Sequence, residues 1–334
     1  MKPQLFRFFR PGPARPLTFA ALLLVLAALT ACTGCQSDAS RAINVFEGRD
    51  RIPPRLTDLR AVSATEVQAV FDEPVTISVN DSPYSCTSSA NTVTFTLGFV
   101  LDAGRSVEIR ATVRDEWSNS TSFSGTVFGY NPDVPALLIT ELTTTGSAKS
   151  PDRTELYCLT DGNLCGVCLY DGLPDEYNFR FVFPSASVRK GDYIVIEWEG
   201  KGNSTVGNVH FFGAGLDTNP SQYNGLQAVS VSPSPGADVM DCVLYANHAG
   251  VAYERFGSAK NLRRATKAVE RGLWRAGGEI TGLCAVDASK TSATRSIARI
   301  WPYQDTDTAY DWYITATGGC TFGAANTAPA FDYQ

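Results

Sequence analysis

The stretch between Leu137 and Glu199 most constrains what this chain can fold into. It opens with LLITEL, continues through RTELYCLTDGNLCGVCLYDG and closes with FVFPSASVRKGDYIVIEWEG. Short runs in which apolar and polar residues alternate are separated by clusters of turn-forming residues, a pattern typical of consecutive β-strands. Frequent Gly, Pro, Thr, Val and Tyr also favour β-structure with many turns over a helical bundle. The sequence therefore predicts an all-β protein.

Residues 1–31 are expected to be a leader rather than part of the fold. Four basic residues precede an almost wholly apolar segment, 17–31, which is the pattern of a secretory signal. This segment is shorter than the ~20 apolar residues that a membrane-spanning helix needs. It ends in Leu29-Thr30-Ala31-Cys32, which is similar to the bacterial lipobox. The resemblance implies cleavage before Cys32 and a lipid anchor (palmitate or a related acyl chain) on that cysteine. An ordinary signal peptide with a chance cysteine is the alternative.

The lipobox resemblance implies a lipid-anchored protein of the bacterial cell envelope, facing the periplasm or the surface. Thr33, in place of aspartate, favours the outer membrane by the enterobacterial sorting habit. Residues 32–52 are polar without a strand period and would tether the folded part to the membrane. Loss of residues 1–31 would remove four positive charges from a chain of net charge −6 and leave −10. Such an acidic chain disfavours nucleic acid as a partner, because that binding depends on neutralising phosphates.

Residues 53–132 are expected to form a first β-sandwich, since five segments with alternating polarity are separated there by turn signals. Three pieces carry a further pattern: Phe71-Asp72-Glu73-Pro74-Val75, Leu101-Asp102-Ala103-Gly104, and Val113-Arg114-Asp115 with Asn119. In this order they resemble bacterial immunoglobulin-like repeats, although Ser118 stands where these repeats have glycine. The resemblance implies a spacer domain. We interpret Asp115 as the cap of a turn, with a metal ligand as the alternative.

Residues 133–330 are expected to form a second, larger β-sandwich. Its motifs are Ile139-Thr140-Glu141-Leu142, Arg153-Thr154-Glu155-Leu156-Tyr157, Leu164-Cys165-Gly166-Val167-Cys168-Leu169-Tyr170-Asp171, Phe181-Val182-Phe183-Pro184, Val188-Arg189-Lys190-Gly191-Asp192-Tyr193-Ile194-Val195-Ile196, Ala237-Asp238-Val239-Met240-Asp241-Cys242-Val243, Ser296-Ile297-Ala298-Arg299, Asp305-Thr306, Asp311-Trp312, and Gly323 with Asn326. Their order resembles the lamin-tail domain, an immunoglobulin-like module that implies a docking role. Val167 departs from the family, which has tryptophan at that position.

Glu141 and Glu155 are charged residues on expected strands with apolar neighbours. A carboxylate in such a place must face solvent or accept hydrogen bonds from loop amides. We interpret both as framework residues, and a glycosidase-type pair of carboxylates is the alternative. Trp312 and Phe181 are interpreted as core residues rather than as a stacking platform.

The chain has nine cysteines, of which Cys32 would carry the lipid. The even number that remains in an exported chain indicates disulfides, with buried free thiols as the alternative. Cys165 and Cys168 are three apart on one expected strand and would point to opposite faces, which suits neither zinc binding nor a redox motif. Because Cys158 and Cys165 flank the turn at 160–162, a disulfide across a hairpin is the pairing we expect.

Two insertions interrupt the second sandwich. Residues 200–225, rich in Gly, Asn and Ser, predict a long loop with an apolar tip, HFFGAG. Residues 258–276 predict an amphipathic helix, capped by Ser258 and ended by Gly277-Gly278, that packs one face on the sandwich. A membrane-surface or partner-binding role for its basic face is the alternative. The candidate binding surface is His210, Phe211, Phe212, Arg263, Arg264, Lys267 and Arg271.

The sequence predicts a protein that is not an enzyme and needs no cofactor. It has no GxSxG, HExxH or P-loop motif, and only His210 and His248 could supply the histidine of a catalytic triad. Three aspartates close in sequence are weak calcium candidates, with ordinary turn residues as the alternative: Asp305, Asp307 and Asp311.

The functional prediction is a lipid-anchored binding, docking or structural protein of the cell envelope. Its partners would be the membrane, through Cys32, and an envelope or extracellular protein or a glycan. The alternatives are an exported hydrolase and a carbohydrate-binding adhesin.

Overall fold

The computed structural model describes residues 50–147, 149–198, 207–212 and 223–332. The expected leader 1–31, the lipidation site Cys32, Cys35 and the tether up to residue 49 lie outside the described residues, as does most of the expected loop 200–225. Within the described ranges, no helix combines the length and apolar content needed to cross a membrane. The chain divides into two units, Met1–Ile52 and Pro53–Gln334, and every element named below belongs to the second.

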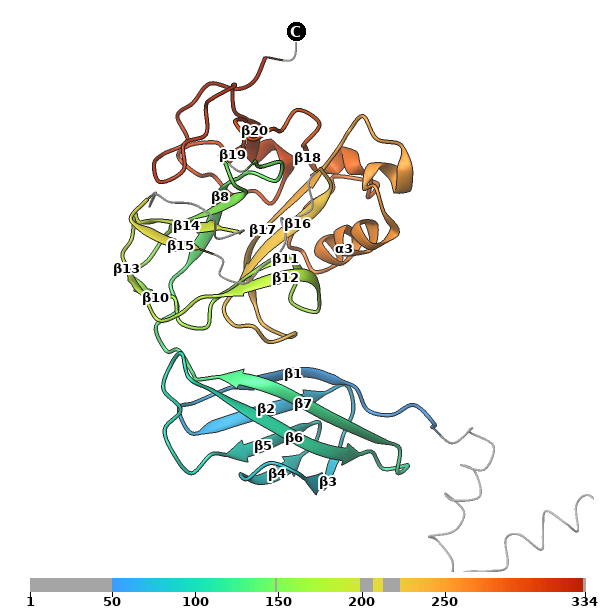
Figure 1. Ribbon diagram of the computed structural model, residues 1–334. Helices are drawn as coiled ribbons and strands as arrows, with labels where there is room; N and C mark the ends of the chain where they lie inside the picture. Colours follow the sequence, from blue (N-terminus) through green and yellow to red (C-terminus); the bar gives the residue numbers. More distant parts are fainter. Residues whose placement is uncertain (1–49, 148, 199–206, 213–222, 333–334) are drawn as a thin grey trace, which may run out of the picture. The chain divides into compact units, whose positions relative to one another are not determined.

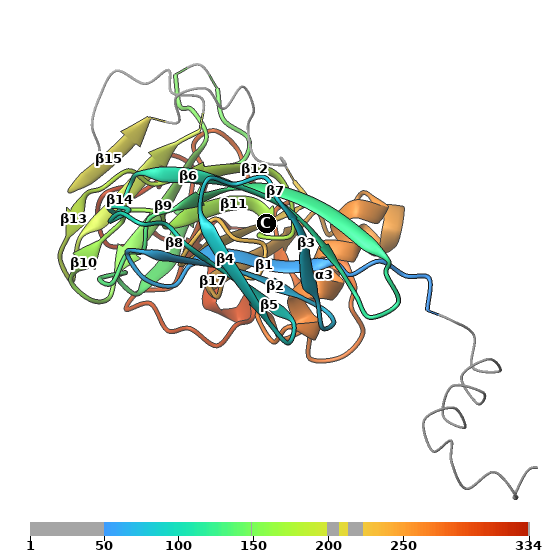
Figure 2. The same cartoon turned by 90° about the horizontal axis from the view of Figure 1, so that it is seen from below.

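The first sandwich consists of a four-stranded sheet, in the order β1-β2-β5-β4, and a three-stranded sheet, β3-β6-β7 (Figure 1). Its strands are β1 (Leu56–Ala61), β2 (Glu66–Phe71), β3 (Thr76–Asn80), β4 (Ser85–Ser89), β5 (Thr92–Thr96), β6 (Ser106–Arg114) and β7 (Ser120–Phe128). Figure 2 shows the long antiparallel hairpin of β6 and β7. In β6, Val107, Ile109, Ala111 and Val113 are buried in turn while their neighbours face outward. The alternation read from the sequence therefore corresponds to one buried face.

The second sandwich consists of a six-stranded sheet, β15-β14-β9-β8-β19-β20, and a five-stranded sheet, β12-β11-β16-β17-β18. The strands of the first are β8 (Leu137–Leu142), β9 (Arg153–Cys158), β14 (Tyr193–Glu197), β15 (Val209–Phe212), β19 (Ile297–Arg299) and β20 (Trp312–Ile314). Those of the second are β11 (Cys168–Leu173), β12 (Glu176–Val182), β16 (Gly225–Ser230), β17 (Val239–Ala246) and β18 (Val286–Asp287). A separate pair joins β10 (Gly162–Asn163) to β13 (Ser187–Val188).

Each sandwich has its own hydrophobic core. Residues between Leu59 and Val127 form one cluster of buried side chains, and residues between Leu137 and Ile314 form the other. Three short 3₁₀ helices complete the second sandwich: η1 (Ala252–Arg255), η2 (Gly282–Cys284) and η3 (Ala309–Asp311). The predicted all-β fold of two tandem sandwiches with one helical insertion is confirmed.

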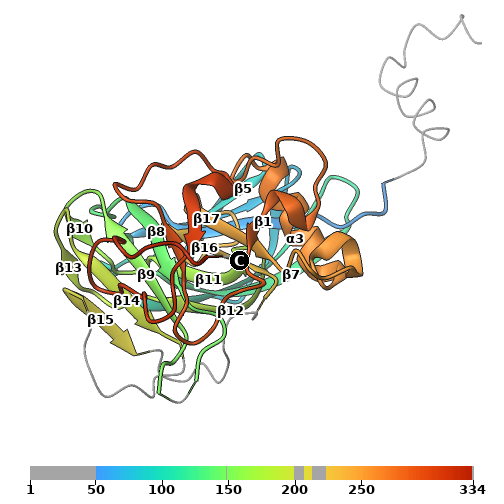
Figure 3. The same ribbon diagram turned by 90° about the horizontal axis from the view of Figure 1, so that it is seen from above.

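Helix α3 (Ala259–Glu270) forms within the expected insertion, and Ser258 caps it by accepting a hydrogen bond from the Asn261 backbone N–H at 3.1 Å. It lies against β16 and β11 of the five-stranded sheet (Figure 3). The helix is shorter than predicted, because Gly272 adopts a φ of 72° directly after the C-cap residue Arg271. A glycine in this left-handed conformation commonly ends a helix, so Gly277-Gly278 is not its end.

Residues 209–212 form strand β15 instead of the expected loop tip. The strand pairs in parallel with β14 at the edge of the six-stranded sheet, with Val209 opposite Ile194. A run of four β-formers inside a Gly- and Asn-rich segment is too short to show a period in the sequence. The rest of the expected loop, 200–206 and 213–222, lies outside the described residues.

The expected disulfide between Cys158 and Cys165 is not formed, and all seven cysteines of the described residues are free thiols. The strands that flank the turn at 160–162 do not pair with each other: β9 pairs with β8 and β14, whereas β10 pairs with β13. The Cys158 thiol instead lies 3.0 Å from the Thr160 carbonyl oxygen, to which it donates. Because β11 begins at Cys168 and Cys165 lies in the preceding turn, these two cysteines do not share a strand.

Candidate functional site

Glu141 and Glu155 form a buried pair of carboxylates at the centre of the six-stranded sheet. They lie opposite each other on β8 and β9, and both are fully buried. Glu141 accepts hydrogen bonds from the Ser296 hydroxyl, from the backbone N–H of Thr321 at 2.9 Å and from the Thr321 hydroxyl at 3.0 Å. Glu155 accepts from the Thr140 hydroxyl at 2.7 Å and from the backbone N–H of Gly323. Of the two situations expected for these carboxylates, hydrogen bonds from loop amides rather than exposure to solvent is the one observed.

The two carboxylates hold their protons more tightly than exposed ones do. Burial raises the pKa of Glu155 to about 8, and the negative charge of nearby Glu141 adds to the rise. Burial also raises the pKa of Glu141, while hydrogen bonds from Ser296 and Thr321 act in the opposite direction. Two like charges in a low-dielectric sheet disfavour joint ionisation. Glu155 is therefore mainly protonated near neutral pH.

Arg299 forms a second buried centre next to this pair. Its guanidinium donates to the Ile139 carbonyl at 2.8 Å, to Asp241 at 2.7 Å and to Asp305 at 2.8 Å. The Trp312 ring lies 4.5 Å from the guanidinium carbon. Burial raises the pKa of Asp241 to about 7, and the positive charge of Arg299 opposes that rise. Arg299 thus connects β19, β8, β17 and the loop that contains Asp305.

Asn326 connects the two buried centres. Its carboxamide donates to the backbone carbonyls of Thr140 at 2.7 Å and of Arg299 at 2.9 Å, and its oxygen lies 2.8 Å from the Thr321 hydroxyl. The motif residues Glu141, Glu155, Asp241, Arg299 and Asn326 therefore belong to one hydrogen-bonded network, the "buried network" below. It joins the segment 321–326 to the middle of the sheet.

The three calcium candidates each bond to a different protein group. Asp305 pairs with Arg299, and Asp307 lies 3.9 Å from the exposed Arg275. Asp311 accepts from the backbone N–H of Thr306 at 2.8 Å and completes a capping box at η3. These contacts are those of ordinary turn residues and give the calcium interpretation no support.

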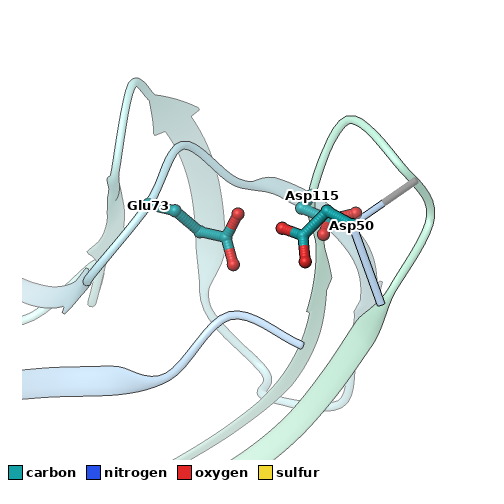
Figure 4. A group of neighbouring side chains, drawn as sticks. All are labelled: Asp50, Glu73 and Asp115. Atoms are coloured by element: carbon teal, nitrogen blue, oxygen red, sulfur yellow. The ribbon is translucent and has the colours of Figure 1, made fainter. Parts of the chain in front are cut away.

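An acidic group also occurs in the first sandwich, where the carboxylates of Glu73 and Asp115 come within 4.8 Å of each other (Figure 4, which also draws Asp50 of the preceding unit). Asp115 is buried and accepts from the backbone N–H of Asn119 at 2.8 Å and from its side-chain amide at 2.7 Å. The predicted turn cap is thus confirmed, and Asp115 already has hydrogen-bond donors without a metal.

The basic face of α3 is largely paired within the protein. Arg263 binds Glu176, Lys267 lies 2.9 Å from Asp175 and 3.0 Å from Glu176, and Arg271 lies 2.9 Å from Asp175. The hydrogen bond from Arg263, followed by the contact with Lys267, lowers the pKa of Glu176 to about 2. Two acidic residues at the β11–β12 turn therefore neutralise most of the charge of three basic ones.

Arg264 does not lie on the exposed basic face, contrary to the helical pattern. Its side chain is buried and donates to the Asn178 side-chain oxygen at 3.2 Å. Of the four basic residues predicted as binding surface, this one is inaccessible in the folded protein.

The aromatic tip residues 210–212 contribute mostly to the sheet edge. The His210 side chain is buried, stacks on Phe212 at 4.5 Å and lies 3.9 Å from Glu197. Phe211 packs on Phe183 at 5.3 Å, so only Phe212 is an exposed member of this group. His248 follows β17, in the other sheet, and its Nε2 lies 3.1 Å from the Ala285 carbonyl oxygen.

Sequence reasoning missed the exposed side chains of the β19–β20 connection, residues 300–311, which we name the aromatic loop. Ile300, Trp301 and Tyr310 are exposed by 46%, 45% and 90%. The signal that could have found them is a cluster of large apolar residues among Pro, Gln, Asp and Thr, outside any run with a strand period.

Comparison with known proteins finds one family. A family model with the description "protein second domain" matches residues 135–210 and 216–314, more than half of the chain. No curated protein and no solved structure matches the chain. The matched range contains the strands of the second sandwich, apart from Phe211 and Phe212 of β15, and most of the buried network, but it ends before Thr321 and Asn326.

Replacement of Arg299 by alanine should destabilise the protein by about 3–5 kcal/mol, because it leaves the buried Asp241 carboxylate without its cation. Urea unfolding at neutral pH measures the loss. The matched control is Arg275→Ala, which removes an exposed arginine 3.9 Å from its carboxylate and should change stability by at most about 0.5 kcal/mol. Equal losses of stability in the two variants would contradict the role of Arg299 as the cation that compensates the buried Asp241.

The stability of the second sandwich should fall as the pH rises towards about 8. Glu155 keeps its proton in the folded state up to a pKa of about 8, whereas the unfolded chain releases it near the ordinary value of 4.5. The folded state therefore binds more protons between these values, and its free energy of unfolding decreases with pH until both states are ionised. Asp241, with a pKa of about 7, contributes in the same direction.

The variant Glu155→Gln separates the two contributions. In this variant the free energy of unfolding should no longer decrease between about pH 7 and about pH 8. The decrease below about pH 7 that Asp241 causes should remain. Denaturant titrations at a series of pH values test this. A wild-type stability that rises between about pH 7 and about pH 8 would refute the raised pKa of Glu155.

Proposed function

We infer that this chain, which belongs to the family described as "protein second domain", is a non-catalytic binding or docking module of the bacterial cell envelope. A lipid on Cys32 would hold it on the membrane, by preference the outer membrane. The segment 32–52 would be the tether that carries the two sandwiches.

The observation that carries this proposal is the state of the buried carboxylates. Glu141 and Glu155 are the acidic pair that a glycosidase would need, yet both are fully buried and bonded to Ser296, Thr321, Thr140 and Gly323. A catalytic carboxylate must reach its substrate within hydrogen-bond distance. Carboxylates whose oxygens already accept these hydrogen bonds stabilise the fold, which favours a binding function over hydrolysis.

The lamin-tail resemblance supports the same role. The residues that carry it, among them Glu141, Glu155, Arg299 and Asn326, bond to one another or to the same backbone segments. We therefore propose that the second sandwich is a lamin-tail-like, immunoglobulin-like docking module and that these motif residues maintain its fold. Recognition would then depend on its surface loops.

The charge pattern narrows the partners. Because Asp175 and Glu176 pair with the basic face of α3, that face offers little attraction to anionic lipid or nucleic acid. We therefore propose that the lipid on Cys32 attaches the protein to the membrane. Its partner would be an envelope or extracellular protein or a glycan.

Replacement of Cys32 by alanine should abolish lipidation. The thiol of Cys32 would receive the diacylglyceryl group in the proposal, so the variant should lose incorporation of labelled palmitate. Cys35→Ala is the matched control, since it removes a cysteine three positions away and should keep the lipid. Lipid on the Cys32 variant, or none on the wild type, would disprove the anchor.

The docking role is tested by site-specific photo-crosslinking in intact cells. A photoreactive residue at Tyr310, in the aromatic loop, should give a discrete adduct with an envelope component, and one at Phe99, in the first sandwich, should not. Hydrolysis of an envelope polymer by the purified protein, lost in the His210→Ala, His248→Ala double variant, would replace the docking proposal by the hydrolase alternative.

A further inference from the structure

The aromatic loop combines a fixed backbone with exposed apolar side chains. The Ile300 backbone N–H donates to the Asp311 carbonyl at 2.8 Å, and the Tyr303 N–H donates to the Ile300 carbonyl at 2.8 Å. Asp305 is held by Arg299 of the buried network. A loop fixed at both ends and in its middle loses little conformational entropy when a ligand binds. Its exposed Trp301 and Tyr310 are thus preorganised for contact.

Trp301 is supported by a stack of tyrosines. Its ring meets the buried Tyr303 edge to face, with ring centroids 4.8 Å apart and an angle of 88°. Tyr303 in turn contacts Tyr157 at 5.0 Å, and its hydroxyl lies 3.3 Å from that of Tyr193. The Trp301 indole therefore has a defined position although it is 45% exposed.

The backbone of Tyr303 is strained at this point. Its φ is 70°, in the left-handed region that a bulky side chain rarely adopts. Such a conformation persists only where the surroundings fix it, and it is enriched at ligand-binding sites. Here the tyrosine stack and the Asn326 backbone N–H, 3.4 Å from the Tyr303 hydroxyl, hold the residue in place. The contacts that hold this strained conformation therefore also keep the Tyr303 ring against Trp301.

The surroundings of Trp301 indicate the kind of ligand. Gln304, which is exposed, provides a polar group close in sequence to an exposed aromatic ring. A pyranose has a flat C–H face that stacks on an aromatic ring, and hydroxyls at its rim that bond to amides and carboxylates. The aspartates of the loop and the net charge of −6 disfavour an anionic polymer. Charge and shape together fit an uncharged sugar.

We propose that the aromatic loop binds a neutral polysaccharide, with one sugar ring stacked on Trp301 and a second contact at Tyr310. The site rests on the proposed function, because it names the ligand of the envelope binding module. It also assigns a role to the buried network, which positions the loop through the bond from Arg299 to Asp305.

The test is a titration of the mature lipid-anchored protein, in detergent micelles, with neutral oligosaccharides of β-1,4-glucose, α-1,4-glucose, β-1,4-N-acetylglucosamine and α-1,6-mannose. Calorimetry and saturation-transfer NMR measure binding. At least one of these sugars should bind the wild type, and Trp301→Ala should lower the affinity about tenfold or more, while Trp301→Phe, which keeps an aromatic ring, should retain most of it.

The matched control is Phe99→Ala, which removes an aromatic side chain of the same exposure, 45%, from the first sandwich and should leave the affinity unchanged. Tyr310→Ala should cause a smaller loss than Trp301→Ala. Circular dichroism and thermal unfolding show whether each variant folds. Unchanged affinity in a folded Trp301→Ala, or an equal loss in Phe99→Ala, would overturn the site.

The outcomes separate this proposal from the docking role. If none of the four sugars binds and the crosslinker at Tyr310 captures a protein, the sugar proposal fails and the docking function stands. If a sugar binds at Trp301 but the Cys32→Ala variant still incorporates palmitate, the site stands and the lipid anchor fails. Cleavage of the bound sugar would keep the site and refute a non-catalytic function.

Discussion

The second sandwich depends on satisfying two carboxylates that lie side by side at the centre of a sheet. A buried carboxylate without hydrogen bonds would cost several kcal/mol, and water does not reach Glu141 or Glu155. Their donors come from far along the chain: Thr321 is 180 residues from Glu141, and Gly323 is 168 residues from Glu155. The central strands and the segment 321–326 are therefore one energetic unit, and the Asn326 backbone N–H of that segment also contacts the strained Tyr303.

Much of the fold could be predicted because it is a local property of the sequence. The strict alternation in β6 predicts one buried face, and a Ser258 cap before an amphipathic pattern predicts α3. The end of α3 and the existence of β15 could not be predicted in the same way. The first depends on the conformation of Gly272, and the second on a neighbouring strand, β14, that provides hydrogen bonds to a segment too short to show a period.

The site was less predictable because its contacts are long-range. The sequence leaves open whether Glu141 faces solvent or accepts hydrogen bonds from a loop, and it does not identify the loop at Thr321. Helical spacing places Arg264 among solvated residues, yet Asn178 on another element binds it inside the protein. The disulfide prediction failed for the same reason, since it assumed that neighbours in sequence, Cys158 and Cys165, also pair in the sheet. Exposure of Trp301 depends on a tyrosine stack contributed by three separate segments.

The late position of Thr321, Gly323 and Asn326 has a consequence for the order of folding. Synthesis from the N-terminus delivers β8 and β9 long before it delivers these residues. Until then Glu141 lacks the donors of Thr321 and Glu155 lacks that of Gly323, so both carboxylates are more favourable in water than in the sheet. The same bonds that fix the finished domain thus delay the closure of the second sandwich until its last segment is available.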